Sequence, residues 1–455
     1  MTVIPVETLR TEVDRRFDGY LEELFKLIRQ PSISAQGVGI DECAELVERT
    51  LRDAGVDART LPTDGSPVVF GAAGPDSAPF TLLVYGHYDV QPPEPFDAWE
   101  SPPFEPTIRD GRIYGRGVGD NKGQFLASIL AYKLLSELDA APNVKVKFLI
   151  EGEEENGSRN LRAFVNSHRD LLAADAFFAA DGPMHPSGRP IVFFGVRGMV
   201  AAEVRVRGAN RDLHSGNWGG PVPNGAWKLV ELLSTMRGPD GRATIEGFYD
   251  HVVPPTPFER ELLEQIPFDA DGTRAYLGIQ EFDGPADMGY YEKIMFQPTL
   301  TIAGLDSGYT GAGKKSVIPS EAIVRLECRL VPDQQPDQVL EAIAQHVRMY
   351  VPDAEITGLA GQPPSKTSPE LPVSRMAVAS MEEAYGVSPV VMPLLGATAP
   401  NYVFTDDLGL PAIWTTYANH DEDNHAPNEN MTLETFRNGI VASAVLFQRA
   451  ADSGT

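Results

Sequence analysis

Short apolar runs alternate with helix-like segments over the first 180 residues, and this alternation restricts the fold more than any other feature of the sequence. The apolar runs cover residues 80–85, 144–150 and 176–180. Residues 7–29 show the apolar spacing of an amphipathic helix, and further helices are expected at about 41–54, after Lys122 and at 158–173. Strands that alternate with helices are typical of an α/β domain with a mostly parallel central sheet flanked by helices.

The pattern changes near residue 198. Residues 200–206 alternate like a half-exposed strand. Strands are also expected at 298–303 and 321–331, and helices at about 224–236 and 336–349. Strands and helices with this exposed alternation favour an α+β layer. A polar, proline-containing joint follows at 363–371, after which the first pattern resumes. We therefore expect a discontinuous domain at 1–198 and 369–455, with a second domain at 199–368 inserted into it.

Charge and cysteine content limit the classes of binding partner and the cellular compartment that we expect. The chain carries 64 acidic against 38 basic residues, a formal net charge of −26. Such a surface repels phosphates and anionic lipids, so we expect neither nucleic acid nor a membrane as a partner. There is no signal-peptide pattern at the N-terminus and no apolar stretch of about 18 residues. With only Cys43 and Cys328, both expected to be buried, the sequence predicts a cytoplasmic protein without a disulfide framework.

Acidic and histidine side chains follow several of the apolar runs, where the carboxyl ends of sheet strands place binding sites in α/β proteins. The candidates are His87 and Asp89 in YGHYDV, Asp120 in GRGVGDNKG, the glutamates of EGEEENGS, Asp181 in FFAADG, and His420 and His425 in NHDEDNHAPNE. Each segment alone is a weak signal. Together they predict a divalent metal site, because carboxylate oxygens mixed with imidazole nitrogens suit Zn²⁺, Mn²⁺ or Co²⁺.

Such a site could hydrolyse an amide. Two metals that share a carboxylate would polarise a carbonyl and lower the pKa of a water between them from about 15.7 to about 7. A neighbouring carboxylate could then accept the proton of that water. Alternation along an extended chain also lets Asp89 lie behind His87 and hold its imidazole in one tautomer.

Seven motifs in order along nearly the whole chain resemble those of the aminoacylase/carboxypeptidase G superfamily of zinc peptidases. They are HYDVQP at 87–92, GRGVGDNKG at 115–123, EGEEENGS at 151–158, DLHSGNWGG at 212–220, KKSVIP at 314–319, CRLVP at 328–332 and HAPNE at 425–429. Within the superfamily the sequence is most similar to carnosinase-like cytosolic nonspecific dipeptidases. The resemblance implies that the inserted domain is a lid and dimerisation domain.

The resemblance implies two divalent metal ions per subunit, with Zn²⁺ as the first expectation and Mn²⁺ or Co²⁺ as alternatives. His87, Asp120 and Asp181 would hold one metal ion. Asp120 would bridge to the second, which Glu155 and His425 would complete.

The resemblance also implies catalytic and substrate-binding residues. Glu154 would be the general base, and Asp89 would orient the histidine ligand. His214 would stabilise the oxyanion in the active site of the partner subunit, so we expect a homodimer. Arg329 would bind a substrate carboxylate, because its planar guanidinium suits a bidentate pair, and Thr398 would lie near the same carboxylate.

Two assignments have competitors in the sequence. Glu153, Glu154 and Glu155 are adjacent, so a shift of one residue would exchange base and ligand; the following Asn-Gly-Ser favours Glu154 as base. His420 competes with His425, which the trailing PNE favours.

The function expected from these residues is that of a metallodipeptidase acting on a small peptide. An N-acyl amino acid deacylase or a carboxypeptidase on the same scaffold is the alternative, because both need the same metals and the same grip on a carboxylate. The segment LLGATAP at 394–400 departs from the family pattern, which leaves the substrate open. A non-catalytic scaffolding protein is a third reading, which the complete set of predicted ligands disfavours.

Overall fold

The computed structural model describes residues 3–452 and divides the chain into two compact units. Unit 1 comprises the residues up to 195, 367–393 and those from 400 onward, and unit 2 comprises 196–366 and 394–399. The domain predicted at 1–198 and 369–455 includes five terminal residues, 1–2 and 453–455, that lie outside the described part.

Unit 1 is an α/β layer structure. Its main helices are α1 (Val6–Arg29), α2 (Ile40–Asp53), α3 (Gly123–Glu137), α4 (Leu161–Ser167), α5 (Arg169–Leu172), α12 (Pro372–Tyr385) and α13 (Leu433–Asp452). Its strands are β1 (Asp57–Leu61), β2 (Val68–Ala73), β3 (Thr81–His87), β4 (Thr107–Arg109), β5 (Arg112–Tyr114), β6 (Lys145–Glu151), β7 (Ala176–Ala180), β8 (Ile191–Phe193), β17 (Val390–Met392), β18 (Ala412–Thr415) and β19 (Asn430–Thr432). The short strand β9 (Gly195–Val196) spans the boundary between the units.

The main sheet has eight strands in the order β1-β2-β6-β3-β7-β18-β8-β17. Its four central strands, β6, β3, β7 and β18, run parallel to one another, and antiparallel pairs join them to β2 on one side and β8 on the other. The predicted fold class is therefore confirmed. Because parallel strands end at the same edge, His87, Glu151 and the residue after Ala180 emerge together.

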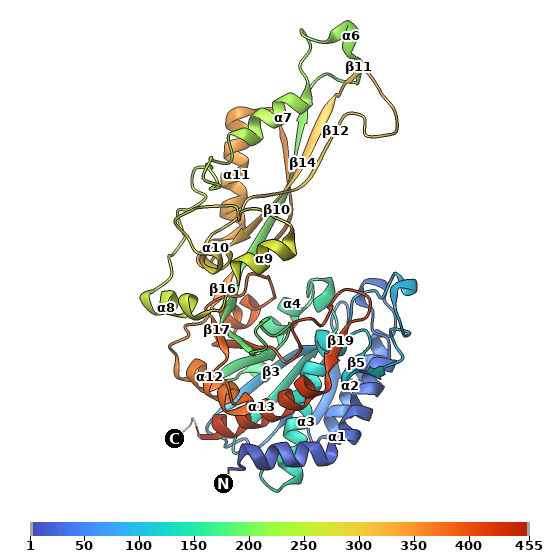
Figure 1. The fold of residues 1–455 in the computed structure, drawn as a ribbon, viewed down its shortest axis with the longest axis vertical. Coiled ribbons are helices and arrows are strands. Elements are labelled where there is room, and N and C mark those ends of the chain that lie inside the picture. Colours follow the sequence, from blue (N-terminus) through green and yellow to red (C-terminus); the bar gives the residue numbers. More distant parts are fainter. Residues whose placement is uncertain (1–2, 453–455) are drawn as a thin grey trace. The chain divides into compact units, whose positions relative to one another are not determined.

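Both faces of this sheet are buried, as expected for a parallel sheet covered on two sides. Leu82 and Val84 of β3 face a core shared with α1, α3 and α13, which pack together in Figure 1. On the opposite face, Tyr85 of β3 contacts Phe177 and Trp414 in an aromatic cluster. No helix among residues 3–452 is long and apolar enough to span a bilayer.

Unit 2 has a four-stranded antiparallel sheet in the order β12-β14-β10-β15. Its strands are β10 (Gly198–Arg207), β11 (Leu213–His214), β12 (Thr301–Ser307), β13 (Val317–Ile318), β14 (Glu321–Leu330), β15 (Glu355–Gln362) and β16 (Ser365–Lys366). Its helices are α6 (Ser215–Trp218), α7 (Gly225–Ser234), α8 (Pro257–Gln265), α9 (Ala270–Leu277), α10 (Tyr290–Phe296) and α11 (Pro336–Tyr350). Alternate residues of β10 and β14 form one core with α7 and α11.

Two predicted elements differ from the structure. The helix expected at 158–173 is divided into α4 and α5 at His168, whose ring stacks on Phe164 at a centroid distance of 4.3 Å. The strand expected at 298–303 begins later, at Thr301. Pro298 has no N–H to give to the β-ladder, and the Thr299 N–H donates to the Arg329 carbonyl at 3.0 Å just before the strand begins.

Candidate metal centre

The candidate metal centre lies at the carboxyl edge of the parallel strands in unit 1. His87 is the last residue of β3, and Asp181 follows β7, the neighbouring strand. Asp120 lies in a tight turn, Val118–Lys122, just before α3, and its peptide bond to Asn121 is cis. The Asn121 amide donates to the Ala180 carbonyl at 2.7 Å and so ties this turn to the end of β7.

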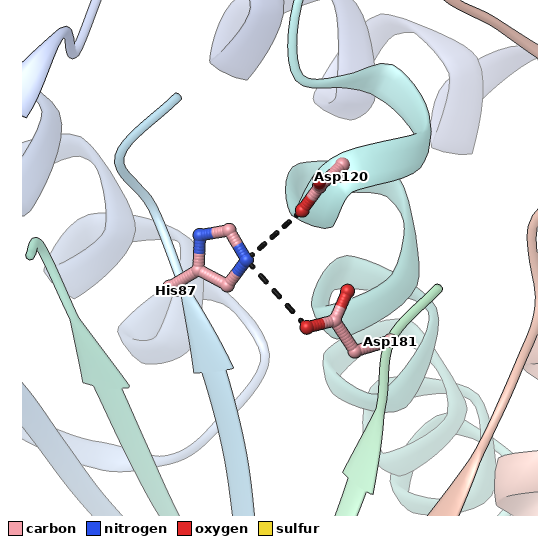
Figure 2. Close-up of side chains that lie close together, drawn as sticks. All are labelled: His87, Asp120 and Asp181. Carbon is pink, nitrogen blue, oxygen red and sulfur yellow. Dashed lines mark ion pairs between the residues drawn. The ribbon is translucent and has the colours of Figure 1, made fainter. Parts of the chain in front are cut away.

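A first group of ligand-type atoms surrounds the His87 ring. Its Nε2 lies 3.1 Å from Oδ1 of Asp120 and 3.8 Å from Oδ2 of Asp181, and Figure 2 shows both carboxylates facing this nitrogen. The His87 side chain is fully buried, and its Nε2 has no hydrogen-bond partner of acceptable geometry. A buried polar nitrogen without a partner is costly, which a metal ion bound at this nitrogen would remedy.

A second group shares Asp120 with the first. Nε2 of His425 lies 3.0 Å from Oδ2 of Asp120 and 3.1 Å from Oε2 of Glu155. Each oxygen of Asp120 thus faces a different histidine. In both groups the ligand atoms all lie within 4.8 Å of one another. All five residues that the sequence predicted as metal ligands therefore lie in these two groups.

Asp89 connects the first group to the glutamate segment. Its carboxylate is fully buried and lies 3.4 Å from Nδ1 of His87, while its backbone carbonyl lies closer to the same nitrogen, at 3.1 Å. The same carboxylate accepts the backbone N–H groups of Glu154 and Glu155 at 3.2 and 3.1 Å. One side chain thus contacts a histidine of the first group and fixes the backbone of the segment that reaches the second.

The three adjacent glutamates point to different partners. The Glu153 carboxylate accepts N–H groups of Ser66 and Asn160 at 2.8 and 3.2 Å, away from both groups. Glu155 belongs to the second group, and the Gln91 amide donates to its carboxylate at 2.9 Å. Glu154 is half-buried and lies close enough to both groups for their charges to shift its pKa.

The Asp120 turn is held by Glu429, a buried glutamate to which the sequence analysis gave no role. Glu429 is fully buried and accepts backbone N–H groups of Gly117, Gly119 and Asp120 at 2.9, 2.9 and 3.1 Å. It also forms an ion pair of 2.8 Å with Arg116. Glu429 is the last residue of the HAPNE motif, in which only His425 was predicted to have a function. Gln91 was also missed, although it stands in the quoted HYDVQP motif.

Negative charge accumulates in the centre. Burial and the charge of Asp120 raise the pKa of Asp181 to about 7. Burial, with the charges of Asp181, Asp120 and Glu155, also raises the pKa of Glu154 well above its ordinary value. Burial opposes ionisation of Asp120 too, yet the hydrogen bond from His425 and the charge of the neighbouring His87 ring hold its pKa below the usual range. Buried carboxylates that repel one another in this way favour a bound cation.

The residues present fit a pair of divalent ions. Imidazole nitrogens and carboxylate oxygens are the donors that Zn²⁺ uses in hydrolytic sites, and Mn²⁺ and Co²⁺ accept the same set. A carboxylate with one oxygen toward each group is suited to bridge two metals.

The remaining predicted site residues belong to unit 2. His214 is exposed at the end of β11, and its Nδ1 accepts the Gly216 N–H at 3.1 Å. This bond assigns the proton of the neutral ring to Nε2, which can therefore act as a donor. Arg329 on β14 donates from Nη1 to the Thr398 hydroxyl at 2.7 Å. The structure thus brings the predicted carboxylate-binding arginine and threonine together within this unit.

The other histidines lie outside both groups. His420, the competitor of His425, is exposed, and its Nδ1 lies 3.8 Å from the Asp421 carboxylate. The buried His185 bonds to the Ser187 hydroxyl at 2.9 Å. Cys43 and Cys328 are both free and buried, as expected.

Residues 83–449 match the peptidase family M20/M25/M40. Among curated proteins, the chain is 26% identical to the Cys-Gly metallodipeptidase of Schizosaccharomyces pombe over 96% of each chain. It is 32% identical to the human Beta-Ala-His dipeptidase over 64% of this chain and 57% of that protein. The first of these alignments spans both structural units.

Solved structures lead to the same family. An M20 family metallo-carboxypeptidase from Sulfolobus solfataricus superposes with a TM-score of 0.86 at 34% identity, over 95% of this chain and 99% of that one. Human carnosine dipeptidase 1 gives 0.80 at 26% identity, over 99% and 100%. The extent of the family match, together with these relatives, confirms the predicted enzyme class: the chain belongs to the peptidase family M20/M25/M40 and is a metallopeptidase.

Proposed function

We propose that this metallopeptidase is a dipeptidase that hydrolyses its substrate at two divalent metal ions. The observation that carries the proposal is the Asp120 carboxylate, whose two oxygens face His87 and His425 in two adjoining groups of ligand atoms. The names of the full-length relative and of human carnosine dipeptidase 1 supply the substrate class, since each is a dipeptidase.

In this proposal the two groups are the metal sites. His87 and Asp181 hold one ion, Glu155 and His425 hold the other, and Asp120 bridges them; Zn²⁺ is the expected metal. When bound, the metals would polarise the scissile carbonyl and lower the pKa of the attacking water. Asp89 keeps the His87 ring oriented, because its backbone carbonyl and its carboxylate both lie against Nδ1, on the side away from the ligand nitrogen.

Glu154 is the proposed general base. It accepts a proton from the attacking water, whose oxygen adds to the carbonyl carbon, and then gives that proton to the leaving nitrogen as the C–N bond breaks. Burial and the neighbouring carboxylates raise its pKa above the ordinary value, which makes the Glu154 carboxylate a stronger base for the proton of the water.

The test of this assignment is the pair Glu154→Gln and Glu153→Gln. Glu154→Gln should bind metal like the wild type but lose at least about 100-fold in kcat, the lower end of what general-base catalysis contributes. Glu153→Gln is the matched control, because its carboxylate is engaged with Ser66 and Asn160 and should leave kcat within a few-fold. Near-normal turnover by Glu154→Gln with metal bound would contradict the assignment.

Residues 199–368 are proposed to act as a lid and dimerisation domain. His214 supports this role, because its ring is exposed and presents Nε2 as a hydrogen-bond donor beyond its bond to Gly216. In a homodimer, that donor would stabilise the oxyanion in the partner subunit. Arg329 and Thr398 would bind the carboxylate of the substrate.

Subunit complementation tests the dimer directly. His214→Ala and Glu154→Gln should each be inactive alone. If His214 acts in the partner subunit, mixing and reassembling the two variants should restore activity, since the mixed dimer has one site with both residues. If His214 acts within its own chain, the mixture stays inactive, and the dimer proposal is wrong.

A carboxypeptidase or N-acyl amino acid deacylase is the second candidate. It is favoured by the metallo-carboxypeptidase of Sulfolobus solfataricus, which is named for that activity and superposes with a TM-score of 0.86. Comparing kcat/KM for Ala-Ala, N-acetyl-alanine and N-blocked Ala-Ala separates the two. A dipeptidase should prefer the substrate with a free amine, and a preference for the blocked substrates would favour the second candidate.

A further inference from the structure

The segment Leu394–Ala399 belongs to unit 2, although the chain on both sides of it belongs to unit 1. Arg197 binds this segment closely. Its backbone N–H donates to the Ala397 carbonyl at 3.0 Å, and its Nε donates to the Gly396 carbonyl at 2.8 Å. Arg197 therefore has its main chain and the inner nitrogen of its guanidinium fixed, while its two terminal nitrogens form no hydrogen bond or ion pair within residues 3–452.

Arg329 binds the same segment through Thr398. Its Nη1 donates to the Thr398 hydroxyl at 2.7 Å, and its Nη2 lies 3.0 Å from Oε1 of Glu327. Both terminal nitrogens of Arg329 thus already have a partner in the protein. Its side chain is about one-third exposed, so its remaining hydrogen atoms can still reach a ligand.

The charges around the two arginines do not balance. In the part of the chain that the structure describes, no carboxylate pairs with Arg197, whereas Arg329 pairs with Glu327. Burial and the charge of Arg329 lower the pKa of Arg197 to about 10, and only Glu327 opposes this shift. Two guanidinium groups against one carboxylate leave one positive charge, which a single bound carboxylate would neutralise.

We propose that Arg197 is a second binding residue for the C-terminal carboxylate of the substrate. Its terminal nitrogens supply the free donors, and Arg329, fixed by Thr398 and Glu327, supplies the neighbouring positive charge. The subsite thus selects substrates that end in a free carboxylate. This proposal rests on the proposed peptidase function and adds a residue to it.

A purely structural role for Arg197 is the competing explanation, because its bonds to Gly396 and Ala397 would fasten the segment in any case. The two explanations differ in what a change of substrate reveals. A residue that binds the carboxylate matters only for substrates that have one. A residue that only fastens the segment matters equally for a dipeptide and for its C-terminal amide.

The experiment measures kcat/KM for Ala-Ala and for Ala-Ala-amide in the metal-loaded wild type, Arg197→Gln and Arg197→Lys. Arg197→Gln should lower the value for Ala-Ala by about 10- to 100-fold, mainly through KM, as expected for lost hydrogen bonds to a charged group. The value for the amide should stay within about threefold. Arg197→Lys, which keeps the charge, should recover part of the preference for the free carboxylate.

Arg189→Gln is the matched control. Arg189 donates from its side chain to the carbonyls of Ser388 and Pro389 at 2.7 and 2.9 Å, so it also fastens a chain segment, but it belongs to unit 1. Its replacement should leave the ratio between the two substrates unchanged. An equal loss for both substrates in Arg197→Gln would overturn the proposal.

A binding measurement separates this proposal from the proposed function. Ala-Ala and Ala-Ala-amide are titrated calorimetrically into metal-loaded Glu154→Gln, with and without Arg197→Gln. If the wild type cleaves neither compound, the dipeptidase function is wrong, but this titration still decides the subsite. Binding of the acid that is no tighter than binding of the amide, or a preference that survives Arg197→Gln, would refute it.

Discussion

Replacing Asp89 by asparagine should weaken metal binding and turnover while the protein stays folded. The Asp89 carboxylate is fully buried and lies against three groups: Nδ1 of His87 and the backbone N–H groups of Glu154 and Glu155. The backbone carbonyl of Asp89, which the replacement keeps, also contacts Nδ1 at 3.1 Å. An asparagine side chain has one oxygen in place of two. At most one of the two backbone donors keeps its acceptor. The amide NH₂ group then faces the other N–H, and in one of its two orientations it also faces the histidine.

The size of the effect follows from these contacts. A buried donor left without an acceptor costs about 1–3 kcal/mol. At about 1.4 kcal/mol per factor of ten, a cost of this size in the metal-bound state would weaken metal binding by about 5- to 150-fold. Removal of a side chain that orients a metal-binding histidine costs about 10- to 100-fold in affinity or activity. We therefore expect Asp89→Asn to bind metal about 10- to 100-fold more weakly and to stay at least tenfold slower at saturating metal.

The assay titrates metal-free protein with Zn²⁺ in a competing chelator and then measures kcat at saturating metal. Asp175→Asn is the matched control, because Asp175 accepts the Thr81 N–H at 2.7 Å at the opposite end of the same strand. It should change neither quantity beyond twofold. Wild-type affinity and wild-type kcat in folded Asp89→Asn would refute the orienting role.

Three further predictions concern the surroundings of the same centre. Asp120→Asn should lower the metal content from two ions per chain to less than one, because each oxygen of Asp120 belongs to a different group. His425→Gln changes only the second group and should keep about one ion per chain. Elemental analysis after gel filtration measures the metal content of both variants. Glu429→Gln should lower the free energy of unfolding by about 3 kcal/mol or more in denaturant titrations, since it leaves the buried Arg116 without its charge partner. Burial raises the pKa of Glu151 to about 7 from 4.5, so the folded state holds a proton that the unfolded chain releases, and stability falls as the pH rises through that window. Unfolding of the metal-free wild type and Glu151→Gln should therefore diverge by about 3 kcal/mol between about pH 4.5 and 7, and parallel pH profiles would contradict this.

The sequence predicted the elements whose pattern is local. The helix expected at 7–29 is α1 at Val6–Arg29, and the strand expected at 176–180 is β7 at Ala176–Ala180. Strands such as β1 and β18 were not predicted. β1 has the polar sequence Asp-Ala-Arg-Thr-Leu, and β18 has only four residues, so neither carries a periodicity that stands out from a loop.

The candidate site was predictable where a residue type sits in a motif, and not where its partner is distant in the sequence. Spacing alone could not choose among Glu153, Glu154 and Glu155. Their carboxylates are distributed by contacts with Ser66, about 90 residues earlier, and with the second metal group, about 270 residues later. Arg197 was not singled out, because its relation to Arg329 arises only when β10 and β14 pair.

The contacts of Glu429 determine when, during synthesis of the chain, the Asp120 turn can form. The turn that presents Asp120 is held by a glutamate more than 300 residues later, and the adjacent strand β19 pairs with β5. A nascent chain that has already released its first strands from the ribosome still lacks the second histidine and the glutamate that shapes the bridging turn. Loading of the proposed pair of metal ions therefore requires synthesis to have passed residue 429, and a translation product that ends earlier should be metal-poor as well as inactive.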